Sequence, residues 1–412
     1  MDARTRHLLK IGLLASTLEW YEFSVYGFLA GTLGQLFFKS TSKTVALIQA
    51  FALFALSYLA RPLGSLFFGL IGNRIGRNQV LKISLLLMSI PTVLIGCLPT
   101  YEQMGSLATL ALLCLRLIQG FATGGELPAS ACYVFEESLP DSNKSLLCSS
   151  AAVGPLIGLL FGSLATSLLS FYFTQETLLA WAWRLPFWFG IPLTFVIAYL
   201  RRAIPQMPSP QRTDSKRSPW KGLKIPLLQG IVIIAFLSSA FNTLAIWMPA
   251  YLSYFLEVPY RLAHFTNTLT LCAVVAFCFM AGKLSQHYGH HKVILISTVA
   301  ILLSVYPFFK GLQTATSWGV LLGLQLGLAL FVCGINGTYV EMLGKLFTPV
   351  NRLLGMSLGV TLPSALIGGI TPMLCSYVIH KTGWLMFPAF YIMAFGLLAL
   401  PVALRLKKHG SV

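Results

Sequence analysis

Twelve apolar segments follow one another along this chain and leave little room for a water-soluble fold. Each is about 20 to 30 residues long, enough to cross a bilayer as a helix. Only 10% of the 412 residues are charged and 56% are hydrophobic, whereas soluble domains carry about 25% charged residues. The sequence therefore predicts an all-α membrane protein, with transmembrane helices at residues 10–38, 45–71, 78–98, 103–136, 144–172, 184–202, 222–256, 262–286, 291–310, 317–347, 350–380 and 383–405.

The one long polar stretch, Arg201 to Lys224, separates the sixth apolar segment from the seventh. It contains four prolines and several basic residues, a composition typical of a linker. We expect residues 203–221 to form a cytoplasmic linker. They would join an N-terminal six-helix bundle of residues 1–202 to a C-terminal six-helix bundle of residues 222–412.

The net charge of +17 invites a nucleic-acid-binding interpretation, but the basic residues lie at segment ends and form no continuous face. With both termini placed in the cytoplasm, 22 of the 29 Lys and Arg residues fall on that side and Arg116 falls inside the membrane. This bias follows the positive-inside rule. We expect a monomer in a bacterial inner membrane, with no nucleic-acid partner. The six basic residues on the outer side are Lys39, Lys43, Arg184, Arg261, Lys310 and Lys381.

Enzyme motifs are missing from the sequence: it has no P-loop, GxSxG, HExxH or GxGxxG after a strand. The eight cysteines are scattered, mostly within apolar runs, which favours small buried residues over disulfides or metal ligands. His287, His290 and His291 resemble a metal cluster, but surface charge at the cytoplasmic face is the better interpretation. We expect no enzymatic activity, no cofactor and no metal.

A Gly-rich basic stretch, residues 61–78, lies between the second and third apolar segments. Small residues let two helices turn sharply and pack closely, and arginines keep the turn on the cytoplasmic side. Two of its glycines recur 213 positions later, as Gly282 and Gly289, which indicates two parallel halves. The pattern that carries this signal is Gly69-x-x-Gly72-Asn73-Arg74-x-Gly76-Arg77.

This pattern resembles the signature loop of the major facilitator superfamily. The resemblance implies twelve transmembrane helices in two pseudo-symmetric six-helix bundles, and transport by alternating access. The family loop usually has Asp where this chain has Asn73, and the second copy has Gln286 at the matching place. An acidic group thought to stabilise one gate in the family is therefore absent.

Three further stretches resemble one branch of that superfamily, the metabolite:proton symporters, which include proline/betaine, 2-oxoglutarate, shikimate and citrate permeases. The resemblance runs through almost the whole chain and implies proton-coupled uptake of a small metabolite. The stretches are Leu18-Glu19-Trp20-Tyr21-Glu22-Phe23-x-x-Tyr26-Gly27, then Arg116-Leu117-Ile118-Gln119-Gly120 with Gly124-Gly125-Glu126, Tyr133 and Glu136, and finally Trp183-Arg184-Leu185-Pro186-Phe187.

Charged side chains inside lipid are costly, so those that remain are candidates for function. Glu19 and Glu22 are three residues apart and share one face of the first helix. At about 1.5 Å per residue, Glu19 and Arg116 lie at nearly the same depth. We predict that Arg116 pairs with Glu19 or Glu22, and that this pair binds and releases the coupled proton. The alternative is a permanent pair that only holds two helices together.

The gates are expected near the cytoplasmic ends of the helices. Glu136 could pair with Arg77 and latch one conformation, and Glu341 could act likewise in the second half. Glu126 could be a gate or proton exit, or equally a helix-packing group. The gate candidates are Gly72, Asn73, Arg74, Gly76, Arg77, Glu126, Glu136 and Glu341.

Aromatic and polar side chains within the spans are candidates for substrate binding, because aromatic faces attract ammonium groups. Ordinary packing or an interfacial belt is the alternative. One deep arginine with acids and aromatics fits a zwitterion, such as an amino acid, proline or betaine, better than a di- or tricarboxylate. An organic-acid symporter is the second possibility and a drug exporter the third. The candidates are Trp20, Tyr26, Tyr58, Gln119, Asn242, Trp247, Tyr251 and Asn336.

Overall fold

The computed structural model describes residues 10, 13, 16–75, 77–124, 126–138, 143–202 and 222–406, and every regular element in these ranges is a helix. The long helices are α2 (Thr17–Phe28), α3 (Ala30–Phe37), α4 (Lys43–Ile75), α5 (Arg77–Cys97), α7 (Ser106–Ala122), α8 (Glu126–Glu137), α9 (Lys144–Tyr172), α11 (Leu185–Arg202), α12 (Lys224–Asn242), α13 (Met248–Tyr254), α14 (Tyr260–Tyr288), α15 (His290–Thr314), α16 (Trp318–Asn336), α17 (Tyr339–Leu346), α18 (Arg352–Pro363), α19 (Thr371–Thr382) and α20 (Phe387–Arg405). Short elements are α6 (Tyr101–Met104), α10 (Gln175–Ala180), η1 (Ala182–Arg184) and the π-helical turns η2 (Thr243–Trp247) and η3 (Ser364–Gly368).

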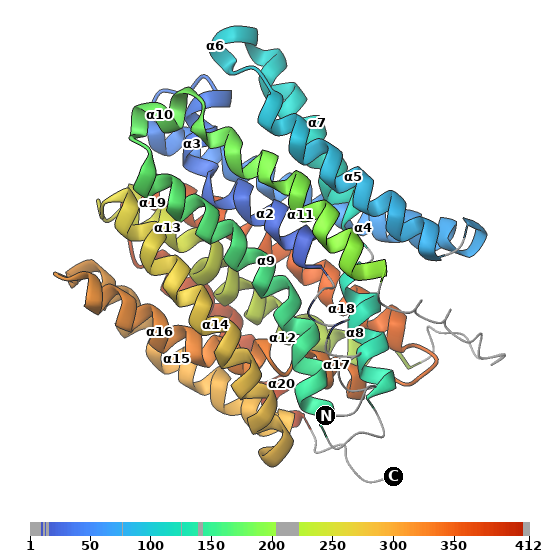
Figure 1. Cartoon of the computed structure of the whole chain (residues 1–412). Helices are drawn as coiled ribbons and strands as arrows, with labels where there is room; N and C mark the ends of the chain where they lie inside the picture. The colour runs from blue at the N-terminus through green and yellow to red at the C-terminus, as the bar shows by residue number, and fades with distance from the viewer. Residues whose placement is uncertain are drawn as a thin grey trace.

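These helices make twelve passes through one bundle, which confirms the predicted fold class (Figure 1). Eight passes, each a single helix or a joined pair, are long and apolar enough to cross a bilayer. The other four passes are α2–α3, α5, α7–α8 and α11. The predicted linker at 203–221 lies outside the described residues, so the boundaries between the two six-helix bundles stay a prediction.

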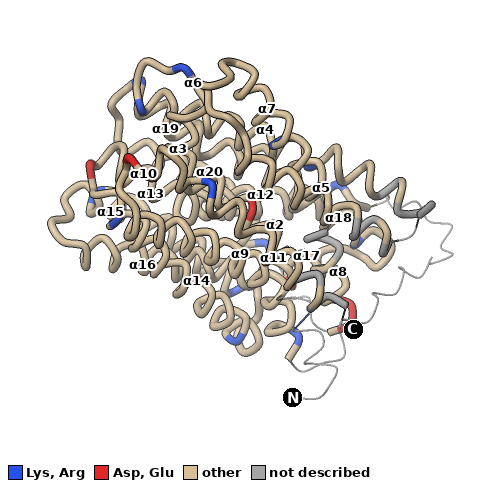
Figure 2. Tube along the Cα trace, turned by 45° about the horizontal axis from the view of Figure 1, so that its top comes forward, with Lys and Arg blue, Asp and Glu red and all other residues tan. Residues whose placement is uncertain are grey.

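The bundle has two ends. We call the end at which α2 and α18 begin the Arg352 face, and the end at which α3 and α13 finish the Phe37 face. Figure 2 shows most Lys, Arg, Asp and Glu residues near the helix ends, with few between them. Large apolar side chains cover the outside, and Leu303 and Phe195 are more than 70% exposed. Such a surface is suited to lipid rather than water.

Small residues bring neighbouring helices into backbone contact. A Cβ at Gly120 in α7 would overlap the carbonyl oxygen of Ser57 in α4, and a Cβ at Gly158 in α9 would overlap that of Thr17 in α2. Without a hydrophobic driving force in lipid, helices associate through such close packing. These contacts hold α7 against α4 and α9 against α2.

Several passes are interrupted near mid-height. η2 begins directly after Asn242, η3 directly after Pro363, and α16 ends at Asn336 before α17 starts. π-Helical turns and broken helices in membrane proteins are frequent at functional sites, because they free backbone groups and redirect side chains. The interruptions therefore point to the middle of the bundle.

The sequence analysis ended the second transmembrane helix at residue 71 yet counted Arg61 on the cytoplasmic side, and this count is wrong. α4 runs through Pro62 to Ile75 without a break. Arg61 is consequently inside the bundle, about 21 Å along the helix from Ile75, and only 6% exposed. The count of basic residues at the cytoplasmic side included it in error.

Candidate functional site

Four charged side chains meet inside the first half of the chain. Glu19 and Glu22 come from α2, Arg61 from α4 and Arg116 from α7, and each is 6% exposed or less. Charges buried this deeply in a membrane protein persist because they pair or act in transport. We call these four residues the charged cluster.

The pairing within the charged cluster differs from the sequence prediction. Nη1 of Arg61 lies 3.7 Å from Oε1 of Glu19, and this is the ion pair of that carboxylate. Arg116 instead donates from Nη1 to Oε1 of Gln119 at 2.9 Å, and Gln119 donates to Oγ1 of Thr92 at 2.7 Å. The predicted contact of Arg116 with Glu19 or Glu22 is thus replaced by an amide bridge.

Glu22 is fully buried and has a different environment from Glu19. It faces the hydroxyls of Ser89 and Thr92 and the guanidinium of Arg116. Within the described residues, neither of its carboxyl oxygens meets a donor at hydrogen-bonding geometry. Glu22 is therefore a buried carboxyl that makes no ion pair with the described residues.

Aromatic rings separate and support the two arginines. The guanidinium carbons of Arg61 and Arg116 lie 4.1 and 4.7 Å from the centre of the Phe23 ring. Arg61 also stacks on Tyr58 at 4.0 Å, and Arg116 on Tyr26 at 4.1 Å. These cation–π contacts stabilise two like charges that would otherwise repel each other in a medium of low dielectric.

The sequence analysis missed Arg61 as a member of this cluster. The available signal was its distance from both ends of the second apolar run, because a residue 14 positions before Ile75 is near mid-membrane on a continuous helix. Grouping Arg61 with the basic residues of the 61–78 stretch concealed that position.

A central cavity lies between the two halves of the chain, directly beside the charged cluster. Its volume not filled by protein atoms is about 570 Å³, part of which is open to the surroundings. Its lining is aromatic, aliphatic and amide in character, and no charged side chain of the described residues belongs to it. The lining residues are Trp20, Tyr58, Ala152, Pro155, Leu156, Ile234, Leu237, Ser238, Phe241, Asn242, Asn336, Tyr339, Val360 and Ser364.

Four of the eight residues predicted to bind substrate line this cavity: Trp20, Tyr58, Asn242 and Asn336. The other four, Tyr26, Gln119, Trp247 and Tyr251, do not.

Those four residues are buried in protein contacts. Tyr26 donates to the carbonyl oxygen of Ala50 at 3.0 Å, and Gln119 bridges Arg116 and Thr92. The stacked pair of Trp247 and Tyr251 bonds Oγ of Ser376 and the carbonyl of Leu385.

The Arg352 face is closed by contacts between the halves. Nη1 of Arg352 in α18 lies 2.9 Å from Oε1 of Glu136 in α8, so Glu136 has a partner other than the predicted Arg77. Glu341 pairs with Lys345 at 2.6 Å and accepts from Ser285 at 2.9 Å.

The predicted surface position of His290 is wrong. The residue is only 4% exposed and lies 3.8 Å from Glu341. It is therefore part of the buried polar contacts of the second half at this face.

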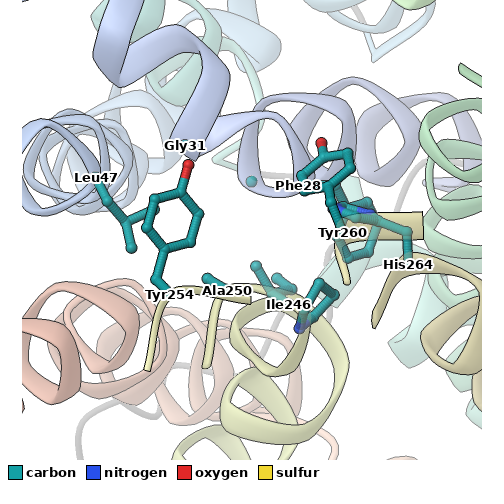
Figure 3. Close-up of a pocket in the computed structure, with 10 residues that line it drawn as sticks. Phe28, Gly31, Leu47, Ile246, Ala250, Tyr254, Tyr260 and His264 are labelled. Atoms are coloured by element: carbon teal, nitrogen blue, oxygen red, sulfur yellow. The ribbon is translucent and has the colours of Figure 1, made fainter. Parts of the chain in front are cut away.

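The Phe37 face is closed as well. Figure 3 shows the Tyr254 side chain of α13 pointing toward Gly31. A Cβ added at Gly31 would overlap the Tyr254 hydroxyl. A Cβ at Gly27 would lie 2.9 Å from Ile246. A pocket of about 270 Å³ remains here, with Tyr260 and His264 in its wall. The two halves of the chain are therefore in contact at both faces.

Several predicted gate residues cannot be placed. Gly76 lies outside the described residues, and the side chains of Asn73, Arg74, Arg77 and Glu126 do too. Gly72 belongs to α4, yet its surroundings are likewise not described. Their gating roles remain predictions.

Twelve passes around a central cavity, with buried charges beside it, define a secondary membrane transporter. A family model described as "Sugar (and other) transporter" matches residues 10–218. The chain belongs to this family of the major facilitator superfamily.

Two relatives match along the entire chain. The glycine betaine/proline/ectoine/pipecolic acid transporter OusA of Dickeya dadantii is 30% identical over 100% of this chain and 85% of its own length. The proline/betaine transporter of Escherichia coli K12 is 28% identical with the same coverage.

Among solved structures, the proton:xylose symporter XylE superposes with a TM-score of 0.74 over 98% of this chain and 95% of its own. The two sequences are 15% identical, so the likeness concerns the fold.

Proposed function

We propose that this protein is a proton-coupled symporter that imports a small zwitterion, such as proline or glycine betaine, by alternating access. The observation that carries this proposal is the position of the charged cluster directly behind the wall of the central cavity. Trp20 and Tyr58 line the cavity, and both rings also contact Arg61. Substrate and proton sites therefore share a wall.

The composition of the cavity favours a zwitterion over an organic acid. Its aromatic rings suit a substituted ammonium group, and its amides and hydroxyls can bond a carboxylate or an N–H group. A dicarboxylate would need several cations in the lining, and the described lining has none. The relatives named for proline and betaine support the same substrate class.

Glu19 and Glu22 are the proposed proton carriers. Glu19 shares its charge with Arg61, whereas Glu22 has no ion pair among the described residues. The protonation of at least one must change as the cavity turns from one face to the other. A zwitterion moving with one proton carries one positive charge, so transport would also respond to the membrane potential.

The orientation follows from the distribution of basic residues. The six basic residues that the sequence analysis assigned to the outer side lie toward the Phe37 face. Because basic residues are scarce on the outer side of a membrane protein, we propose that the Arg352 face is cytoplasmic. Contact between the halves at both faces fits an intermediate of import in a bacterial inner membrane.

Reconstituted proteoliposomes test this function. Counterflow of radiolabelled proline or glycine betaine should occur without a gradient, and an inward pH gradient should drive accumulation. Glu19→Gln or Glu22→Gln should abolish accumulation while sparing counterflow, whereas Glu102→Gln at the exposed α6 should change neither. Accumulation that ignores the pH gradient, or full accumulation by both glutamate variants, would contradict proton coupling.

A further inference from the structure

Unpartnered hydrogen-bond donors gather at one end of the central cavity. Nε and Nη2 of Arg61 make no hydrogen bond within the described part of the chain, nor do the hydroxyl of Tyr58 and Nε1 of Trp20. Buried polar atoms are normally satisfied, and each exception requires an explanation. Here three side chains leave four donor atoms unused.

These donors belong to one site. The Arg61 guanidinium carbon lies 4.0 Å from the centre of the Tyr58 ring and 5.6 Å from that of Trp20. Both rings line the cavity. Arg61 uses only Nη1 toward Glu19, and Nε and Nη2 form the edge of a guanidinium that can hold a carboxylate with two parallel hydrogen bonds.

We propose that this edge of Arg61, with Tyr58 and Trp20, binds the carboxylate of the zwitterion, and that this binding draws Arg61 away from Glu19. The inference rests on the proposed function and adds the residues that would link substrate to proton. Arg116 leaves the same two donor atoms unused among the described residues, but the rings it lies over, Phe23, Tyr26 and Phe54, do not line the cavity. Arg61 is therefore the arginine whose neighbouring rings, Trp20 and Tyr58, face the substrate space.

The coupling follows from competition between two carboxylates for one cation. The 3.7 Å separation of Arg61 and Glu19 exceeds that of a charge-assisted hydrogen bond, so a better-aligned carboxylate can replace Glu19. When Arg61 turns to the substrate, Glu19 loses its contact with this guanidinium, and a nearby cation stabilises the charged form of a carboxyl group. A proton from water then binds to Glu19, and substrate and proton enter together.

Substrate-induced proton uptake tests this inference on the purified full-length chain in detergent and weak buffer. Glycine betaine should cause about one proton to be taken up per molecule bound, read with a pH-sensitive dye. Choline has the same quaternary ammonium group without a carboxylate, and it should cause no uptake. Glu19→Gln should bind betaine without proton uptake.

Variants of the donor set complete the test. Arg61→Gln should weaken betaine binding at least tenfold and leave choline binding within about threefold, a contrast that a purely structural role of Arg61 would not produce. Arg405→Gln, at the exposed end of α20, is the matched control and should behave as wild type. Should Arg61→Gln fail to fold, Tyr58→Phe removes one donor alone and should weaken betaine more than choline.

The possible failures are distinct. If the wild-type chain binds neither betaine nor proline, the proposed substrate class is wrong. If it binds betaine but Arg61→Gln and Tyr58→Phe bind it equally well, or if choline elicits the same proton uptake, the proposed carboxylate site is overturned while the transport function stands.

Discussion

Glu136 and Arg352 form an ion pair of 2.9 Å between α8 of the first half and α18 of the second. Arg352 is also anchored to its own half, because its Nε donates to the carbonyl oxygen of Gly344 at 3.0 Å. The contact therefore joins two parts that must separate whenever the cavity opens toward the Arg352 face.

Glu136→Gln should shift the protein toward opening at that face. Glu136 is 45% exposed, so the loss is modest, about 0.5 to 1 kcal/mol or two- to fivefold in population. Cys148 is a native reporter, since it is fully buried near this face, and its maleimide labelling should accelerate by that factor. Labelling of the equally buried Cys375 in α19, toward the opposite face, should not accelerate.

Gly31→Leu should block transport by preventing closure of the Phe37 face. Any side chain at this position enters the space of Tyr254, so the two halves cannot approach. Uptake should fall at least tenfold. Gly323→Leu in α16 is the control, because no atom lies within 4 Å of its Cβ position. Adding Tyr254→Ala to Gly31→Leu should restore part of the uptake, and its failure to do so would argue against a steric gate.

Substitution of Trp247 should lower stability without changing KM, and substitution of Tyr58 should raise KM without changing stability. Trp247→Phe removes a buried 2.8 Å hydrogen bond to Ser376 and should cost about 1 to 3 kcal/mol of stability without changing KM. Tyr58→Phe removes a hydroxyl that has no protein partner among the described residues, so its thermal unfolding should be unchanged while KM for betaine rises. Equal effects of both variants on KM would contradict the assignment of the cavity.

Asn242 should distinguish proline from betaine. Its Nδ2 donates to Ser238 at 2.9 Å, while its Oδ1 has no donor in the described structure and the residue lines the cavity. Proline offers N–H groups to that oxygen and betaine offers none. Asn242→Leu should raise KM for proline about tenfold and that for betaine less than threefold, measured by counterflow. A uniform rise for both substrates would show that Asn242 acts only through packing.

The twelve passes, the transporter class and the depth of Glu19, Glu22 and Arg116 followed from the sequence. Each depends on local composition, because a bilayer imposes a fixed apolar length and penalises every charge within it. Trp20, Tyr58, Asn242 and Asn336 were also predicted as cavity residues, since aromatic and amide groups in such spans are few.

Only the tertiary structure decided which charges pair. Depth along a helix does not fix the direction in which a side chain points, so Arg116 and Arg61 were both compatible with Glu19, and helix packing placed Arg61 beside it. Likewise Glu136 found Arg352 across the halves, and Trp247 and Tyr251 turned away from the cavity into hydrogen bonds. Sequence sets how deep each group lies in the membrane, and the rotation and contact of the helices set its partner.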